Sequence, residues 1–410
     1  MLKQIEGSRA VAEAVAMCRP QVICAYPITP QTHIVEALSA MVKKEELAAE
    51  FLNVESEFAA MSVAIGAAAA GARSYTATAS QGLLYMSEAV WNAAGLGLPI
   101  VMTVANRAIG APINIWNDHS DAMSQRDAGW LQLYAETSQE ALDLHIQAFR
   151  IAEELSVPVM VCMDGFLLTH ASERADIPEQ AQVDAFLPRY EPRQVLDPGE
   201  PVSIGAMVGP EAFTEVRYLA YERMRQALEL IPAVRAGFAA GFGRDSGGLV
   251  RPYLTEDAET VVVALGSVLG TIKDTVDELR ASGRKVGVLG ITSFRPFPAA
   301  AVRDALGGAR RVVVVERALA PGSGGIVTAD IRAAVDLEIC TVIAGLGGRA
   351  VTRKSLLSLL QTSELPSLTF LDLNTTLVEA EVARMSAARR SGPSAENLLR
   401  DLGITASRIG

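Results

Sequence analysis

A run of small apolar residues constrains the fold of this chain more than any other stretch. From Phe58 to Ala72 the sequence reads FAAMSVAIGAAAAGA, in which Ser62 is the one polar residue. A helix of this composition is apolar on every face, so we expect it to be buried. The next run, RSYTATA from Arg73 to Ala79, is rich in β-forming residues and ends at the polar turn Ser80-Gln81-Gly82. A helix, a strand and a polar turn in this order indicate an α/β fold.

The same alternation extends along the chain and predicts two α/β units. The first is expected to hold a parallel sheet with helices on both faces, and the second a smaller, doubly wound parallel sheet. In the first unit the other predicted strands are Pro20–Ala25, Pro99–Ala105 and Val157–Met163, and the other predicted helices are Gly7–Met17, Gln31–Lys44 and Ser138–Glu154, the last of them amphipathic. In the second unit the predicted strands are Glu259–Gly266, Lys285–Ile291, Arg311–Glu316 and Cys340–Gly345, with helices at Ser267–Ser282, Pro298–Leu306 and Gly325–Val335.

Length and composition divide the chain further. A chain of 410 residues is expected to form two or three domains. We place them at residues 1–254, 255–373 and 374–410, with an arm or linker rich in Pro, Glu, Asp and Gln at residues 172–201. After this arm we expect a helix at Glu211–Leu230 and a Gly-rich turn at Gly237–Gly248, and in the tail a charged helix at Leu377–Arg390.

Charge and hydropathy exclude several classes of partner. The formal net charge of −11 argues against a nucleic-acid or anionic membrane surface. The apolar run from Ala59 to Ala72 is too short to span a membrane. Met1 to Ala10 carries Lys3, Glu6 and Arg9 and does not resemble a secretory signal. We therefore expect a cytoplasmic protein that binds neither membranes nor nucleic acid.

Cysteine and histidine residues are dispersed along the sequence. The four cysteines, Cys18, Cys24, Cys162 and Cys340, form no C-x-x-C pair. Such pairs are typical of iron–sulfur and structural zinc sites, so we expect neither on this chain. The four histidines are also dispersed, which predicts no metal site.

Three predicted strands end in segments suited to binding a ligand. They are the loop Tyr26-Pro27-Ile28-Thr29-Pro30, the turn at Ser80 to Gly82, and the pair Asn106-Arg107. In open α/β sheets ligands bind beyond the carboxyl ends of the strands. Taken alone, the Pro-x-x-Pro loop is also compatible with a rigid turn. Arg107 is suited to hold a carboxylate through two parallel hydrogen bonds, and its alternative role is an ion pair.

Glu57 has two interpretations. Ser56 is a suitable N-cap for the apolar helix, and Glu57 then lies in the first turn, where a carboxylate interacts favourably with the helix dipole. The other interpretation is an acid in an apolar wall that exchanges a proton with a bound heterocycle. Glu55 is the competing acid, and it points elsewhere if the helix begins as predicted.

Several motifs, each weak alone, occur together in one order. They are YPITP at Tyr26–Pro30, the run SEFAAMSVAIGAAAAGA from Ser56, TASQGLLYM at Thr78–Met86, and Asn106-Arg107 followed by NDHSD at Asn117–Asp121. ITSFRPFP at Ile291–Pro298 and IAGLGGRAV at Ile343–Val351 follow them. Over most of its length the chain resembles the alpha subunit of pyruvate:ferredoxin oxidoreductase, in the 2-oxoacid:ferredoxin oxidoreductase family.

This resemblance implies a thiamine diphosphate enzyme. The first unit would be its pyrimidine-binding domain and the second a transketolase C-terminal-like domain. A beta subunit would hold the diphosphate and its Mg²⁺, because this sequence has no Gly-Asp-Gly followed by an Asn pair. Iron–sulfur clusters would lie on gamma and ferredoxin-like delta subunits or domains, which pass electrons to ferredoxin, and coenzyme A would accept the acyl group. The chain would be inactive without these partners.

Residue by residue, the resemblance implies the following roles. Glu57 matches the catalytic glutamate that bonds N1′ of the aminopyrimidine, and Thr29 and Arg107 match contacts to the substrate carboxylate. Pro27 and Ile28 would touch the aminopyrimidine, and the pocket would be lined by Ser80, Gln81, Gly82 and Leu83. No metal ligand is implied on this chain. Two alternatives remain, namely an oxidoreductase for branched-chain or other 2-oxoacids and a non-catalytic scaffold subunit.

Overall fold

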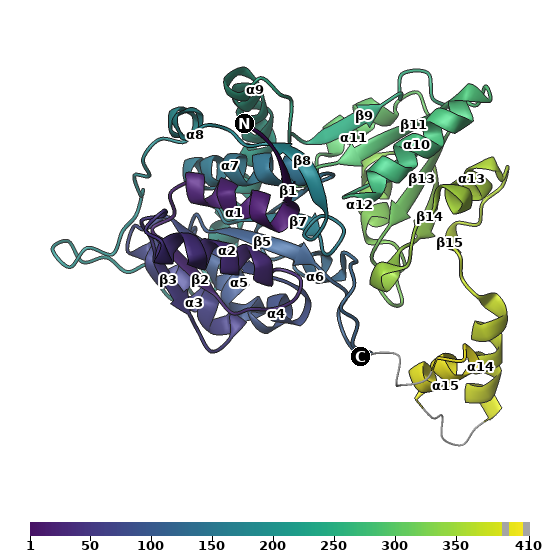
Figure 1. The fold of residues 1–410 in the computed structure, drawn as a ribbon, viewed down its shortest axis with the longest axis horizontal. Coiled ribbons are helices and arrows are strands. Elements are labelled where there is room, and N and C mark those ends of the chain that lie inside the picture. Colours follow the sequence, from purple (N-terminus) through teal and green to yellow (C-terminus); the bar gives the residue numbers. More distant parts are fainter. Residues whose placement is uncertain (388–392, 405–410) are drawn as a thin grey trace.

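The computed structural model describes residues 1–387 and 393–404 and contains two large sheets, each flanked by helices (Figure 1). The α/β fold class is therefore as predicted. A seven-stranded sheet has the order β12-β6-β7-β5-β4-β2-β3, and its strands are parallel apart from β12. Its strands are β2 Val22–Ala25, β3 Glu50–Asn53, β4 Ser74–Thr78, β5 Val101–Asn106, β6 Leu131–Tyr134, β7 Val159–Asp164 and β12 Ser293–Arg295.

Helices cover both faces of this sheet. Strands β4, β5 and β7 are buried along their whole length, as expected for central strands of a parallel sheet. One core contains residues of α1, α2, α7 and α9, and another contains residues of α3, α4 and α5. The helices are α1 Gly7–Met17, α2 Thr32–Lys43, α3 Glu57–Ala69, α4 Ser80–Tyr85, α5 Ser87–Gly95, α6 Ser120–Ser124, α7 Ser138–Leu155, α8 Gln180–Phe186 and α9 Phe213–Phe242.

Helix α3 forms where the sequence predicts it but is not buried on every face. Phe58, Ser62 and Gly66, spaced four residues apart, are exposed on one side. On the opposite side, residues including Met61 and Ala64 are fully buried. The prediction of a wholly buried helix is therefore wrong for this chain by itself, because composition shows how apolar a helix is but not how many neighbours cover it.

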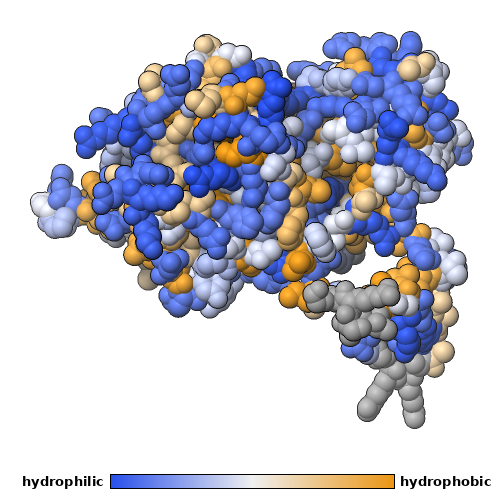
Figure 2. All heavy atoms as spheres, viewed as in Figure 1, coloured by the Kyte–Doolittle hydropathy of each residue, from blue (hydrophilic) through white to orange (hydrophobic). Residues whose placement is uncertain are grey.

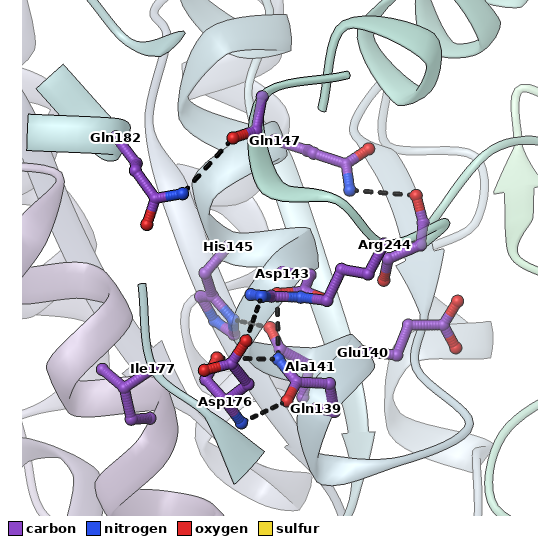
Figure 3. Close-up of polar contacts among 12 residues, drawn as sticks. Gln139, Glu140, Ala141, Asp143, His145, Gln147, Asp176, Ile177, Gln182 and Arg244 are labelled. Carbon is purple, nitrogen blue, oxygen red and sulfur yellow. Dashed lines mark hydrogen bonds and ion pairs between the residues drawn. The ribbon is translucent and has the colours of Figure 1, made fainter. Parts of the chain in front are cut away.

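Helix α7 is amphipathic as predicted, but its polar side is also buried. Asp143 and Gln147, one turn apart on that side, are buried, and so is His145 on another face, where its Nε2 lies 2.5 Å from Thr103 Oγ1 of β5. The segment after α9 covers Asp143 and Gln147, and Figure 3 shows Arg244 reaching both Asp143 and Asp176. The Arg244 Nη2 to Asp143 Oδ1 distance is 2.6 Å, and Gln147 Nε2 donates to the Ser246 carbonyl at 3.1 Å. These partners satisfy the polar groups, so the helix tolerates burial on almost every face.

Helix α9 is longer than predicted, since it continues through Gly237 and Gly241 to Phe242. The expected Gly-rich turn from Gly237 is therefore confined to the residues after Gly243, whose φ of 68° ends the helix. Phe238 and Phe242 stack on each other with ring centroids 4.1 Å apart and pack against Phe186 of α8. This aromatic packing outweighs the low helix propensity of the two glycines.

The expected arm at residues 172–201 is only partly irregular. Its first residues form β8 (Ser172–Asp176), which pairs antiparallel with β1 (Leu2–Glu6), and α8 follows. Between α8 and α9 no helix or strand occurs.

The second large sheet has the order β15-β14-β13-β10-β11-β9, and every predicted element of the second unit is present within about two residues. Strand β9 runs antiparallel to β11 and the other strands are parallel. The elements are β9 Val250–Tyr253, β10 Thr260–Ala264, α10 Val268–Ala281, β11 Val286–Ile291, α11 Ala299–Leu306, β13 Arg311–Glu316, α12 Ile326–Ala334, β14 Glu338–Ile343, η1 Leu346–Gly348, α13 Arg353–Gln361 and β15 Leu368–Phe370.

Strand β12 ties the two halves of the chain together. It follows β11 of the second sheet, yet it pairs antiparallel with β6 at the edge of the first. Phe294 of β12 is fully buried in a core shared by residues of both sheets. The boundary at residue 254 remains a prediction, as do the other domain limits.

The C-terminal helices α14 (Thr375–Ala387) and α15 (Ser394–Asp401) lie beside each other, away from both sheets (Figure 1). The predicted tail helix coincides with α14, and its last expected residues, 388–390, lie outside the described residues. The face in Figure 2 is largely hydrophilic, with scattered hydrophobic patches. Among the described residues, no helix combines the length and the hydropathy needed to cross a bilayer.

Candidate active site

The predicted site residues lie at the carboxyl ends of four adjacent strands. Strands β5, β4, β2 and β3 are neighbours in the first sheet. Arg107 follows β5, Ser80 follows β4, the loop Tyr26–Pro30 follows β2, and Glu57 begins the helix after β3. The parallel sheet therefore gathers segments separated by many residues at one edge, which is where such folds bind ligands.

Glu57 is held in the first turn of α3. Ser56 is the N-cap and its side chain accepts a hydrogen bond from Ala59 N at 3.2 Å, as the sequence predicts. Glu57 is buried, with 7% of its surface exposed, whereas Glu55 is exposed. Among the described residues, the Glu57 carboxylate has no hydrogen-bond donor. A buried carboxylate without a partner is energetically unfavourable, so this acid is poised for a ligand.

Gly82 fits directly against Glu57. A Cβ atom at residue 82 would lie 2.7 Å from Glu57 Oε1 and 2.6 Å from Thr78 Oγ1. Only glycine permits this approach, which brings the turn after β4 against the acid. Thr78 Oγ1 is buried and lacks a hydrogen-bond partner, a second polar atom beside the same carboxylate.

The turn after β4 is anchored at Ser80, whose φ of 50° is in the left-handed region. Ser80 Oγ donates to the Ala108 carbonyl at 2.5 Å and also contacts the Gln81 side chain. Gln81 lies against Gly110 of the following loop, where a Cβ would come within 2.6 Å of Gln81 Nε2. Leu83 is fully buried in the core beneath the turn.

Arg107 joins the loops after β5 and β2. Its Nη1 donates to the Thr29 carbonyl at 2.9 Å, and its Nε donates to the Asn114 carbonyl at 3.1 Å. The side chain is 6% exposed and makes no ion pair among the described residues. Burial lowers the pKa of Arg107, and the nearby Asp121 partly offsets this effect. A buried guanidinium held by carbonyl groups alone is suited to bind an anion.

The loop after β2 places its residues at different depths. Pro27 and Thr29 are exposed, Ile28 is half-buried and Pro30 is buried. The ring of Pro30 lies against Gly165, where an added Cβ would come within 2.6 Å of Pro30 Cγ. The loop is therefore fixed at its end, and the Thr29 side chain remains accessible beside Arg107.

Asp121, which was not predicted as a site residue, connects the two sides of the site. Its Oδ2 accepts hydrogen bonds from Ser80 N and Arg107 N, both at 2.9 Å. Its Oδ1 accepts from Asn106 Nδ2 at 2.8 Å and from Ala122 N at 2.7 Å. Burial raises the pKa of Asp121 to about 6, although these four donors act against the rise. One carboxylate thus fixes the turn near Glu57 and the backbone of Arg107 together.

A second buried carboxylate, Asp164 at the end of β7, joins the two sheets. Arg317 Nη1 donates to Asp164 Oδ2 at 2.9 Å, and Ser267 N donates to the same oxygen at 2.9 Å. His119 Nε2 lies 2.7 Å from Asp164 Oδ1. Ser267 and Arg317 follow strands of the second sheet, and His119 lies in the loop after β5. The loop that carries Arg107 is therefore braced against the second sheet.

Replacing Asp164 by asparagine is expected to lower the free energy of unfolding by about 3 kcal/mol, because Arg317 would be left buried without its counter-ion. Burial alone would raise the pKa of Asp164, but Arg317 and His119 lower it below its ordinary value of 3.8. The stabilisation is therefore complete above this value and is lost as the pH falls below it. Thermal denaturation should show a large difference between wild type and Asp164→Asn at neutral pH that shrinks in acid.

The matched control is Asp127→Asn, since Asp127 is a carboxylate in the same region whose side chain is 67% exposed. This change should alter stability by no more than about 0.5 kcal/mol. Equal stability of wild type and Asp164→Asn at neutral pH would contradict the bracing role.

The site fits thiamine diphosphate on the basis of its unpaired groups. The buried Glu57 carboxylate offers an acceptor for a protonated ring nitrogen, and the glycine at residue 82 lets the turn after β4 pack directly against that side chain.

All four cysteines are buried, and none of them forms a disulfide.

Two family models match the chain. The family model "Pyruvate flavodoxin/ferredoxin oxidoreductase, thiamine diP-bdg" matches residues 13–236. A second model, "Pyruvate:ferredoxin oxidoreductase core domain II", matches residues 258–356.

Similar proteins cover most of the chain. Pyruvate synthase subunit PorA of Methanosarcina barkeri is 48% identical over 369 residues, which is 88% of this chain and 92% of that protein. Ketoisovalerate oxidoreductase subunit VorA of Pyrococcus horikoshii is 38% identical over 85% of this chain and 90% of its own. A solved 2-oxoglutarate:ferredoxin oxidoreductase from Magnetococcus marinus, 18% identical, shares the fold with a TM-score of 0.72 over 88% of this chain, which spans 65% of that one. The chain therefore belongs to the pyruvate flavodoxin/ferredoxin oxidoreductase family and contains its thiamine diphosphate-binding domain.

Proposed function

We propose that this chain is the alpha subunit of a multi-subunit, thiamine diphosphate-dependent pyruvate:ferredoxin oxidoreductase. The reaction converts pyruvate, coenzyme A and oxidised ferredoxin to acetyl-CoA, carbon dioxide and reduced ferredoxin, and it is reversible. The observation that carries the proposal is the connected set of residues at four adjacent strand ends, from Glu57 through Gly82, Ser80 and Asp121 to Arg107.

In this assignment Glu57 is the catalytic acid. Its carboxylate, which has no donor among the described residues, would accept a hydrogen bond from the aminopyrimidine nitrogen and hold the proton shared with it. The acid stands at a helix N-terminus and is 7% exposed. Thiamine diphosphate supplies the carbanion chemistry that breaks the bond to the substrate carboxylate. Pro27, Ile28 and the turn at residues 80–82 would hold the ring, and Leu83 supports the turn from below.

Arg107 and Thr29 hold the carboxylate of the 2-oxoacid. The Arg107 Nη2 group donates to no protein acceptor among the described residues, while Nη1 and Nε hold it in place. The carbonyl that Arg107 contacts belongs to Thr29 itself, so the hydroxyl and this carbonyl are on the same residue. A short hydroxyl side chain at this position suits a small monocarboxylate such as pyruvate.

Other chains complete the enzyme in this proposal. A beta subunit holds the diphosphate and Mg²⁺, and gamma and delta subunits or domains carry the iron–sulfur clusters that pass electrons to ferredoxin. The buried thiols agree with this division, since burial raises the pKa of Cys18 and of Cys24, the latter to about 12. Such thiols are poor cluster ligands, because ligation requires the thiolate.

The test is the coenzyme A-dependent reduction of a viologen dye, measured on the complex purified through this chain. Pyruvate should be oxidised with higher kcat/KM than 2-oxoisovalerate and 2-oxoglutarate, and the complex should contain bound thiamine diphosphate. Preference for a branched-chain 2-oxoacid would show that the complex is another 2-oxoacid:ferredoxin oxidoreductase and that pyruvate is not its main substrate. A complex without thiamine diphosphate and without turnover would instead indicate a scaffold subunit.

A further inference from the structure

Folding brings together three potential metal ligands that the sequence separates. Glu6 ends β1, His33 lies in the first turn of α2, and His170 follows β7 in the turn before β8. One ligand atom from each of them lies within 4.8 Å of the others. The sequence predicts no metal site because its histidines are dispersed, but two of the four lie here with ring centroids 4.5 Å apart. We propose that Glu6, His33 and His170 form a binding site for a divalent transition-metal ion of the zinc class.

The backbone holds two of these ligands side by side. Glu6 is paired with Ser172 in the register of β1 and β8, two residues beyond His170. Gly7 N donates to the Ala171 carbonyl at 3.1 Å, and Ser8 N donates to the Thr169 carbonyl at 2.9 Å. The segments carrying Glu6 and His170 are therefore fixed relative to each other, whether or not an ion is present.

The orientation of His170 is also fixed. Its Nδ1 lies 2.7 Å from Thr169 Oγ1, and that buried hydroxyl accepts a hydrogen bond from Phe166 N at 2.7 Å. With Nδ1–H donating to this oxygen, the second ring nitrogen, Nε2, carries the lone pair that an ion needs, as in metal sites where the other imidazole nitrogen donates a hydrogen bond.

His33 and Glu6 supply the movable side of the site. His33 Nδ1 lies 2.7 Å from Glu6 Oε1, and their side chains are 48% and 33% exposed. Zinc ligands at about 2.0–2.2 Å from the ion lie about 3.3 Å from each other in a tetrahedron. Small rotations of these two accessible side chains bring the three ligand atoms to that spacing, and water fills the fourth position.

The ligand types select the class of ion. Two imidazoles and one carboxylate suit Zn²⁺, Co²⁺ or Ni²⁺, whereas Mg²⁺ and Ca²⁺ prefer oxygen ligands alone. The ion would fasten the first turn of α2 to the β1–β8 ribbon. Because α2 follows the Thr29 loop directly, the proposed ion braces the helix on which that loop ends.

The test is the zinc content of the complex purified through this chain. The complex, with excess Mg²⁺ present, is dialysed against buffered micromolar free Zn²⁺, and zinc is measured by elemental analysis. Wild type should hold one more zinc per copy of this chain than His33→Ala or His170→Ala. Circular dichroism should show that both variants remain folded, and zinc should raise the melting temperature of wild type but not of either variant.

Glu36→Gln is the matched control, because Glu36 is an exposed carboxylate three residues after His33 on the same helix. This variant should keep the wild-type zinc content, and Glu6→Gln should lower the zinc affinity more than tenfold. Equal zinc content in wild type, His33→Ala and His170→Ala would overturn the proposal. So would the absence of bound zinc in the wild type at this concentration.

Discussion

Replacement of Glu57 by glutamine is expected to lower pyruvate oxidation by about 10²–10⁴-fold, the usual contribution of a positioned acid or base. Glutamine keeps the size of the side chain that packs against Gly82, so the turn after β4 should retain its position. It cannot take up or release a proton, and the exchange with the cofactor ring is lost. The measurement is coenzyme A-dependent viologen reduction by the assembled complex, with subunit content determined in parallel.

Glu55→Gln is the control for this experiment. Glu55 is an acid two residues earlier in the sequence, but its side chain is exposed. Its replacement should leave turnover within about twofold of wild type, since surface substitutions away from a site have small effects. Normal turnover of a fully assembled Glu57→Gln complex would rule out Glu57 as the catalytic acid.

Replacement of Arg107 by alanine is expected to raise the KM for pyruvate by about 10–100-fold, while the KM for coenzyme A changes little. A hydrogen bond to a charged group contributes about 1.5–3 kcal/mol, and each 1.4 kcal/mol is a factor of ten. The guanidinium is buried between two loops and makes no ion pair among the described residues, so its charge is available to the substrate. Steady-state kinetics with each substrate varied in turn measures both constants.

Two variants separate substrate binding from a structural effect. Arg126 lies just after α6 and pairs with the exposed Asp127, and Arg126→Ala should leave both KM values near wild type. Arg107→Lys should recover part of the pyruvate affinity, because lysine keeps the charge but not the two parallel hydrogen bonds. An equal rise of both KM values in Arg107→Ala would indicate that the arginine only supports the fold.

The sequence predicts the central strands and most helices because their signals are local. Buried strands such as β5 and β13 are continuous apolar runs, and Ser56 marks the start of α3. The sequence predicts neither the short edge strands nor β6, a four-residue strand inside the first sheet, because their pairing depends on distant segments. Strand β12, for example, pairs with β6 although the two are far apart in the chain. The sequence predicts the amphipathic helix α7 but not the burial of its polar side, because only the fold shows that Arg244 covers Asp143.

For the site, the sequence identifies groups that act alone but misses those that act through partners. Glu57 and Arg107 stand at predicted strand or helix ends, so the α/β pattern is enough to propose them. Asp121 and Asp164 are recognised only when Ser80, Arg107 and Arg317 are seen donating to them. In the sequence, Asp121 is part of the NDHSD motif and Asp164 ends a buried strand, but neither pattern shows which groups the carboxylate contacts.

The most direct measurement is an experimental structure of the assembled complex with thiamine diphosphate and pyruvate bound. We expect a Glu57 carboxylate oxygen at about 2.6–3.2 Å from the aminopyrimidine nitrogen. The Arg107 guanidinium and the Thr29 hydroxyl should both contact the pyruvate carboxylate. A cofactor ring bound away from Glu57, or a pyruvate carboxylate held by other residues, would contradict the proposed site.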